Sequence, residues 1–152
     1  MPEQNFDQLI SETVSAVLET MFFTIPVGHA ELKVHAGDME ARLAFHGRPS
    51  GALDVRVSRS GARMLAGGFL GEEDETLTDT QLGQVTSELA NMLCGSLVSK
   101  LEPEESFDLD PPELAPVRTE DSSERESSLA SRQSFQLESG VLTVSLCLEV
   151  ET

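Results

Sequence analysis

Residues 78–101 read TDTQLGQVTSELANMLCGSLVSKL and carry the longest helical pattern in the chain. When the stretch is projected at about 100° per residue, its large apolar side chains fall on one side. These residues are Leu82, Val85, Leu89, Met92, Leu93 and Leu97. Thr78 stands where the N-cap of such a helix is expected. The pattern therefore predicts a long amphipathic helix with one face in the core.

The opposite side of this predicted helix is polar along its whole length. Its residues follow spacings of three and four and so form one continuous ribbon: Gln81, Gln84, Glu88, Asn91, Gly95 and Ser99. Glu88 and Asn91 project as neighbours, and Gly95 leaves the surface beside Asn91 without a side chain. Asn is a poor helix former, and a Gly within a helix costs about 1 kcal/mol relative to Ala, so both positions need a reason.

Two interpretations of the ribbon stay open at this point. Glu88 and Asn91 could be ordinary solvated residues, since Glu is common and a Glu-x-x-Asn pair arises readily by chance. Gly95 could face a neighbouring helix of the same protein, where small residues allow close packing. Alternatively, the missing side chain at Gly95 lets the backbone of another molecule approach, as a docking surface requires.

The rest of the chain predicts an α+β fold. A helix over residues 5–23 is capped by Asn5 and closed by Pro26, and a shorter helix over residues 60–70 ends at Gly71. Alternating polar and apolar residues at 31–35, 40–46, 53–58 and from Phe135 to Val150 predict strands, the first two paired as a hairpin. We expect one domain over residues 1–152, with a mainly antiparallel sheet and helices packed on one face.

The segment after the long helix changes composition. Residues 102–132 are dense in Glu, Asp, Pro and Ser. They predict a brief strand around Phe107 and then an acidic mobile loop at about 113–132.

Charge and composition exclude several classes of function. The chain has 152 residues and a net charge of −17, from 27 acidic and 10 basic residues. Such a surface repels polyphosphate, so no nucleic-acid partner is expected. No apolar run reaches the roughly 20 residues that span a bilayer, and no signal peptide opens the chain, so we expect no membrane partner and a cytoplasmic location.

Cysteine and histidine usage gives little sign of a metal site. Cys94 and Cys147 stand alone among apolar residues and are interpreted as reduced core thiols. His29, His35 and His46 lie on or near the first predicted hairpin and could in principle bind zinc. Exposed strand histidines are the favoured interpretation, because no cluster of Cys or acidic ligands accompanies them.

The run Ser87–Gly95 resembles the Glu-x-x-Asn-x-x-x-Gly signature of the CheC/CheX family of chemotaxis phosphatases. The segments before it, 64–66 and 71–73, are similar to those that precede the signature in the family. Residues 107–112 resemble the strand and Pro-containing stretch that follow it, and 18–22 resemble the end of the first helix. The likeness covers most of the chain except residues 113–132, and it implies a CheC/CheX-like fold.

This resemblance implies a phosphatase that acts on the aspartyl phosphate of a CheY-like receiver domain. Asn91 would orient the attacking water, and Glu88 would pair with the active-site lysine of the receiver. Gln84 and Gly95 are then candidate binding residues on the same face. No metal or other cofactor of its own is expected, since the partner receiver supplies Mg²⁺. An amide suits this role because it can donate to and accept from a water without adding negative charge beside a phosphoryl group.

One departure from the family pattern bears on the number of sites. Some members carry a second Glu-x-x-Asn on the first helix, where this chain reads Glu12-Thr13-Val14-Ser15. We therefore expect one site per chain, as in CheX-type members, and a homodimer as those members form.

Two other hypotheses remain. One is a non-catalytic CheX-like adaptor that binds a receiver or a flagellar-switch partner. The other is a structural dimer module, which burial of Glu88 and Asn91 in a dimer interface would favour.

Overall fold

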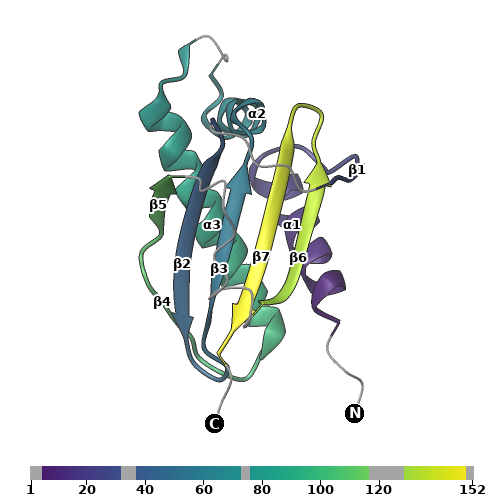
Figure 1. Cartoon of the computed structure of the whole chain (residues 1–152), viewed down its shortest axis with the longest axis vertical. Coiled ribbons are helices and arrows are strands. Elements are labelled where there is room, and N and C mark those ends of the chain that lie inside the picture. The colour runs from purple at the N-terminus through teal and green to yellow at the C-terminus, as the bar shows by residue number, and fades with distance from the viewer. Residues whose placement is uncertain (1–4, 32–36, 73–75, 117–128, 150–152) are drawn as a thin grey trace.

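The computed structural model describes residues 5–31, 37–72, 76–116 and 129–149 (Figure 1). These residues form three helices and seven strands. In order they are α1 (Phe6–Met21), β1 (Gly28–His29), β2 (Met39–His46), β3 (Gly51–Val57), α2 (Arg59–Leu70), α3 (Asp79–Leu101), β4 (Asp108–Leu109), β5 (Glu113–Pro116), β6 (Leu129–Gln136) and β7 (Val141–Leu148).

The strands form one sheet in the order β1-β6-β7-β3-β2-β4, with β5 also pairing to β2. Each of these pairs is antiparallel. β4 and β5 lie one after the other along the outer side of β2, where Phe45 is opposite Leu109 and Ala41 is opposite Leu114. The segment that follows α3 therefore returns along the edge of the sheet, and this places β5 beside the first half of α3 (Figure 1).

The three helices lie on one face of the sheet and bury its apolar side chains (Figure 1). Alternate residues of β2, β3 and β7 point into this core, among them Leu43, Leu53 and Val144, each at most 2 % exposed. They meet the inner stripe of α3, of which Leu89 is fully buried. The α+β class, the mainly antiparallel sheet and the single helical layer are thus as the sequence predicts.

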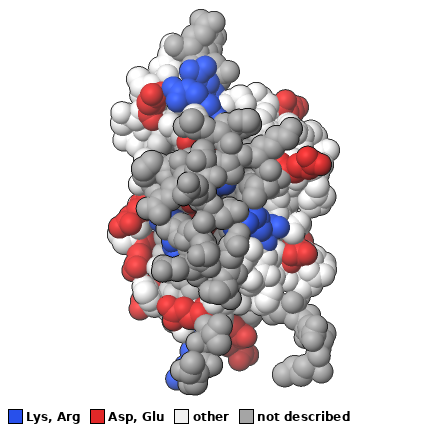
Figure 2. All heavy atoms as spheres, viewed as in Figure 1, with Lys and Arg blue, Asp and Glu red and all other residues white. Residues whose placement is uncertain are grey.

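The other face of the sheet is polar. Two cross-strand ion pairs join β2 to β3: the closest N and O atoms are 3.4 Å apart in Arg42–Asp54 and 3.5 Å apart in Glu40–Arg56. Figure 2 shows this side of the molecule, with acidic side chains along much of its border and a few Lys or Arg side chains among them. The polar residues of the alternating strands therefore point away from the helices, as period-two patterns require.

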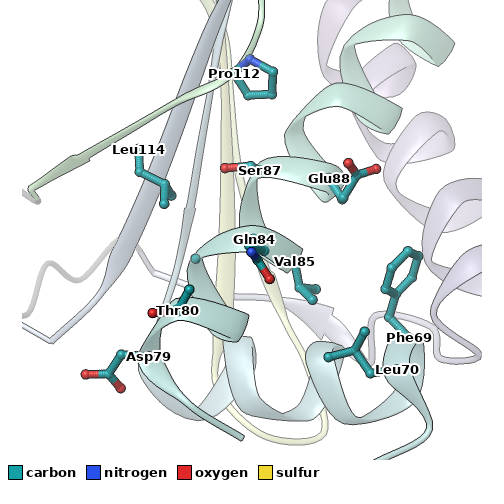
Figure 3. Close-up of a pocket in the computed structure, with 11 residues that line it drawn as sticks. Phe69, Leu70, Asp79, Thr80, Gln84, Val85, Ser87, Glu88, Pro112 and Leu114 are labelled. Atoms are coloured by element: carbon teal, nitrogen blue, oxygen red, sulfur yellow. The ribbon is translucent and has the colours of Figure 1, made fainter.

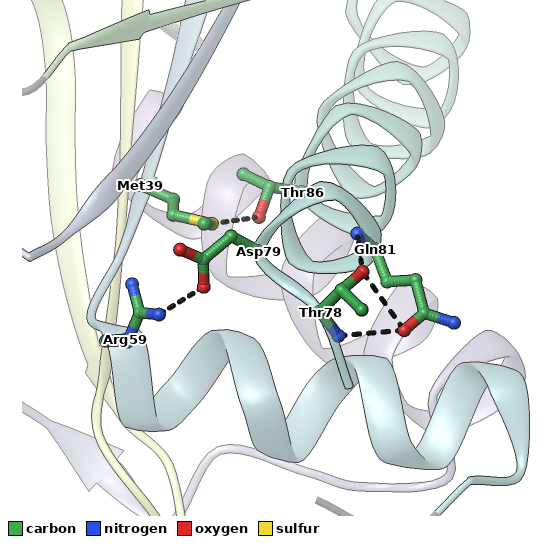
Figure 4. A network of polar contacts seen from close by, with 6 residues as sticks. All are labelled: Met39, Arg59, Thr78, Asp79, Gln81 and Thr86. Carbon is green, nitrogen blue, oxygen red and sulfur yellow. Dashed lines mark hydrogen bonds and ion pairs between the residues drawn. The ribbon is translucent and has the colours of Figure 1, made fainter. Parts of the chain in front are cut away.

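The start of α3 is fixed by polar contacts with its own first turn and with α2 (Figure 4). The backbone N–H of Gln81 donates to Thr78 Oγ1 at 3.1 Å, and the backbone N–H of Thr78 donates to Gln81 Oε1 at 2.8 Å. Together the two hydrogen bonds form a capping box. Asp79 pairs with Arg59 at the start of α2. These contacts hold the two helices at a defined position where the long helix begins.

The structure corrects the extent of the loop expected at residues 113–132. Glu113–Pro116 is strand β5, because its backbone pairs with the outer edge of β2, and Leu129 already belongs to β6. Composition alone hides both strands, since neither β5 nor the start of β6 has a long apolar alternation. The hairpin expected from residues 31–35 falls largely on 32–36, outside the described residues. The chain also contains β1, a two-residue strand that pairs with β6.

Candidate functional site

The polar ribbon of α3 lies on the solvent side of the helix, opposite the core. Glu88 and Asn91 are exposed, whereas Leu89 and Ala90 between them are fully buried. The helical projection therefore places the two residues as the structure does. Since the inner face of the helix is held in the core, the outer face presents Glu88 and Asn91 from a backbone of fixed position.

The members of the ribbon differ in their contacts. Gln81 is used by the capping box, and Ser99 donates to the carbonyl oxygen of Ser96 at 2.9 Å. In the described part of the chain, the side chains of Gln84, Glu88 and Asn91 have no hydrogen-bond or ion-pair partner. These three side chains can therefore contact another molecule without breaking a hydrogen bond or ion pair within the described fold.

Gly95 stands one turn beyond Asn91 and faces open space. A Cβ built at this position would have no described atom within 4 Å. Packing of Gly95 against another helix of this chain, the first of the two interpretations, is therefore wrong for the described residues. The absence of a side chain leaves a bare patch of helix backbone beside Asn91, which another molecule can approach closely.

A shallow pocket of about 770 Å³ adjoins the same ribbon (Figure 3). It is lined by residues of α2, of the first three turns of α3, and of the segment at β5. These residues are Phe69, Leu70, Asp79, Thr80, Gly83, Gln84, Val85, Ser87, Glu88, Pro112 and Leu114. Glu88 and Gln84 thus belong to both the ribbon and the pocket, while Asn91 and Gly95 lie beyond the pocket toward the helix C-terminus.

Sequence patterns identify only the α3 residues of this pocket. Leu70 and Leu114 are large apolar side chains with exposed fractions of 41 % and 52 %. Leu114 falls in the segment expected to be a loop, and its pairing position on β2 cannot be read from composition. The one available signal is that Leu114 is an isolated apolar residue in an acidic, Pro-rich stretch.

Other candidate residues lie apart from this face. Glu12 and Ser15, where a second Glu-x-x-Asn would stand, are exposed on α1. His29 is on β1 at one edge of the sheet, where its ring contacts that of Phe135. His46 is on β2, near the opposite edge, and its Nε2 lies 3.1 Å from Asp110 Oδ2. His35 lies outside the described residues. Within the described ranges, no group of three His, Cys, Asp or Glu residues is placed to hold a metal ion.

Both cysteines are buried, and neither forms a disulfide bond in the described part of the chain. Burial raises the pKa of the Cys94 thiol to about 12, because a thiolate would lose its hydration in the apolar interior of the fold. Cys94 therefore stays protonated at neutral pH and behaves as a small apolar core residue.

None of the helices in the described segments combines the length and apolarity needed to cross a membrane.

The site offers an exposed amide and an exposed carboxylate at fixed positions three residues apart on a helix. The amide of Asn91 can hold a water molecule through one donated and one accepted hydrogen bond. The carboxylate of Glu88 can pair with a cation of a docked partner. Such a face is suited to completing the active site of another protein.

Comparison with known proteins gives a consistent result for sequence and fold. The family model described as "Chemotaxis phosphatase CheX" matches residues 39–134. Among curated proteins, no sequence matches the chain significantly. The chain is similar to the chemotaxis protein CheX from Vibrio vulnificus, with a TM-score of 0.77 and 18 % identity over 98 % of this chain and 99 % of that one.

Two further solved structures share the fold. One is the CheX-CheY-BeF₃-Mg²⁺ complex from Borrelia burgdorferi, with a TM-score of 0.69 and 18 % identity over 97 % of this chain and 100 % of that one. A more distant match is the FliM middle domain from H. pylori, with a TM-score of 0.54 and 12 % identity over 95 % of this chain and 90 % of that one.

Proposed function

The chain belongs to the CheX family of chemotaxis phosphatases, and from this we propose that it hydrolyses the aspartyl phosphate of a CheY-like receiver domain. The observation that carries the proposal is the exposed pair Glu88 and Asn91 on α3, whose side chains have no hydrogen-bond or ion-pair partner among the described residues, in a chain that matches the family model across this helix. The CheX protein of the CheX-CheY complex from Borrelia burgdorferi has the same fold, which supports a receiver as the partner.

Asn91 is the residue proposed to act on the reacting atoms. Its amide would enter the receiver's active site and orient a water molecule for in-line attack on phosphorus. The new bond joins the water oxygen to phosphorus, and the bond from phosphorus to the aspartyl oxygen breaks, which releases phosphate and leaves the aspartate carboxylate. Because this reaction depends on positioning and charge stabilisation, a neutral amide held by a rigid helix is sufficient.

Glu88 is proposed to hold the receiver in register. Its carboxylate would pair with the active-site lysine of the receiver and so fix the depth at which Asn91 enters. Gln84, on the preceding turn, and the bare backbone at Gly95 would border the docked receiver. The receiver would supply Mg²⁺, which neutralises charge on the phosphoryl group, and this chain would contribute neither a metal nor a nucleophile.

We propose that the chain forms a homodimer, as the resemblance to CheX-type members implies. One site per chain is proposed because α1 has Ser15 where a second Asn would be needed. The exposure of Glu88 and Asn91 in the single chain leaves the face available in such a dimer, provided that the dimer contact lies elsewhere.

A panel of receiver domains phosphorylated with acetyl phosphate tests the activity directly. The wild-type chain should accelerate phosphate release from at least one receiver, and Asn91→Ala should slow that release by on the order of 100-fold. Ser99→Ala, which alters an exposed ribbon residue two turns further on, is the matched control and should retain activity. Equal rates for wild type and Asn91→Ala would remove Asn91 from the mechanism.

The second candidate is a non-catalytic adaptor that binds a receiver or a flagellar-switch protein. It is favoured by the fold likeness to the FliM middle domain, because this likeness shows that the same fold also occurs in a protein that is not described as a CheX phosphatase. The adaptor would bind a phosphorylated receiver without increasing phosphate release. The same panel, read for binding as well as for phosphate, separates the two candidates.

A further inference from the structure

The pocket beside Glu88 has an apolar border that the catalytic proposal does not use. Leu70, the last residue of α2, and Leu114 on β5 are both large and more than 40 % exposed. In Figure 3 they lie on opposite sides of Gln84, with Leu114 next to Ser87 and Leu70 next to Phe69. Two isolated elements thus bring apolar side chains to the edges of one depression.

Leu114 is held in this position by both its backbone and its side chain. The backbone of β5 is paired to β2, with Leu114 opposite the fully buried Ala41. Its Cδ1 lies only 2.7 Å from where a Cβ would stand at Gly83. The side chain therefore rests on the bare backbone of α3, and half of its surface remains open to solvent, where it can pack against a partner.

The charged residues that line the pocket are carboxylates. Asp79 and Glu88 are the charged members of the lining, and Asp79 is paired with Arg59. Glu88 has no ion-pair partner within the described chain. The pocket therefore suits a segment that carries a cationic side chain next to an apolar one, because the cation can reach Glu88 while the apolar group contacts Leu70 and Leu114.

We propose that this pocket receives an apolar side chain of the receiver, next to the lysine that contacts Glu88, and that Leu70 and Leu114 determine which receivers dock. The inference rests on the proposed function, since it places the receiver over the same α3 face. It assigns separate tasks to neighbouring parts of that face: Asn91 serves the reaction, and the pocket serves affinity and choice of partner. Truncation of either leucine removes apolar contact area and leaves the reacting geometry intact.

The test compares Leu114→Ser and Leu70→Ser with Val27→Ser in the full-length chain. Val27 is an exposed apolar residue, 60 % exposed, just before β1 at the far edge of the sheet, so it controls for the loss of surface apolarity. Using the receiver most active in the phosphate-release panel, each leucine variant should raise KM by about fivefold to tenfold and leave kcat unchanged. Val27→Ser should change neither, and a KM for both leucine variants equal to that of Val27→Ser overturns the proposal.

Binding to beryllofluoride-loaded receivers keeps the inference testable if the phosphatase activity fails. A receiver that binds wild type but is not dephosphorylated would refute the proposed function alone, and the leucine variants should still weaken its binding by about fivefold to tenfold. Unchanged binding would refute the docking inference alone. If no receiver in the panel binds the wild-type chain, both fall. Leu70 and Leu114 lie on separate elements, so the second variant decides the matter if one fails to fold.

Discussion

The side chain of Leu114 on β5 occupies the space in which a side chain at Gly83 of α3 would begin. The Leu114 Cδ1 is 2.7 Å from the position of a Cβ on Gly83, which is closer than two carbon atoms can pack. The glycine thus lets a strand that is distant in sequence lie against the surface of α3. It is through this contact that β5 forms one wall of the pocket beside Glu88.

Gly83→Ala should therefore move Leu114 without unfolding the chain. The obstructing atom is the tip of a half-exposed, flexible side chain. The free energy of unfolding of the variant should therefore lie within about 1 kcal/mol of the wild-type value. The KM for a receiver should rise as it does for Leu114→Ser, because the pocket wall is displaced. Denaturant unfolding and steady-state phosphate release measure the two effects. An unchanged KM would show that the position of Leu114 does not matter for docking.

Substitution of Gly95 should separate stability from activity. Gly95→Ala meets no described atom within 4 Å and should stabilise the fold by about 0.5–1 kcal/mol, since Gly is the poorer helix former. Gly95→Leu should also fold but should lower phosphate release, because its side chain projects from the surface beside Asn91. Ser99→Leu, one turn further along the ribbon, is the matched control. If Gly95→Leu and Ser99→Leu are equally active, the bare backbone has no role in docking.

Thr78→Ala should destabilise the chain by about 1 kcal/mol, through the loss of the α3 capping box. The side chain of Thr78 accepts the hydrogen bond from Gln81 N–H at 3.1 Å, and the alanine cannot replace it. Urea denaturation measures the change, with Thr80→Ala, which removes an exposed threonine in the first turn, as the control. Equal midpoints for the two variants would mean that the cap contributes nothing to stability.

The buried thiol of Cys94 should lower the free energy of unfolding at alkaline pH. Burial raises the pKa of its thiol from 9.0 to about 12. Between these values the unfolded chain loses this proton and the folded chain keeps it, so the unfolded state binds fewer protons. The free energy of unfolding should therefore fall as pH rises above 9, by up to about 1.4 kcal/mol per pH unit from this group.

Cys94→Ala provides the control for this pH dependence. The variant loses some packing at every pH, but its free energy of unfolding should decline less steeply between pH 9 and 11. Denaturant unfolding at several pH values gives the two slopes directly. Parallel slopes would show that the thiol does not titrate differently in the folded and unfolded chains.

The helices and the main strands could be predicted from the sequence because their periodicity is long enough to be specific. α3 repeats its apolar stripe over 23 residues, so both its existence and its polar face follow from the pattern. The placement of Glu88 and Asn91 on one exposed face needed nothing more. The chemical role proposed for them rests on resemblance to a family, since an exposed Glu and Asn have no special property by themselves.

The pocket could not be predicted, because its walls are joined by tertiary contacts. β1 has two residues and β5 has four, which is too short for an alternating pattern to be recognised. β5 is a strand because its backbone pairs with the open edge of β2. Whether such an edge is open depends on the arrangement of the sheet and cannot be read from residues 113–116 themselves. Leu70 and Leu114 come to line one pocket only after both the α2–α3 packing and the β2–β5 pairing are in place.

The two sides of α3 also have different freedom to change. A substitution on the inner side, such as at Leu89, alters the core and with it the stability of the whole chain. A substitution at Gln84, Glu88 or Asn91 breaks no hydrogen bond or ion pair within the described fold, so its effect should add independently to that of a core substitution. One helix can thus acquire new partner preferences by successive surface changes while its buried side stays as it is.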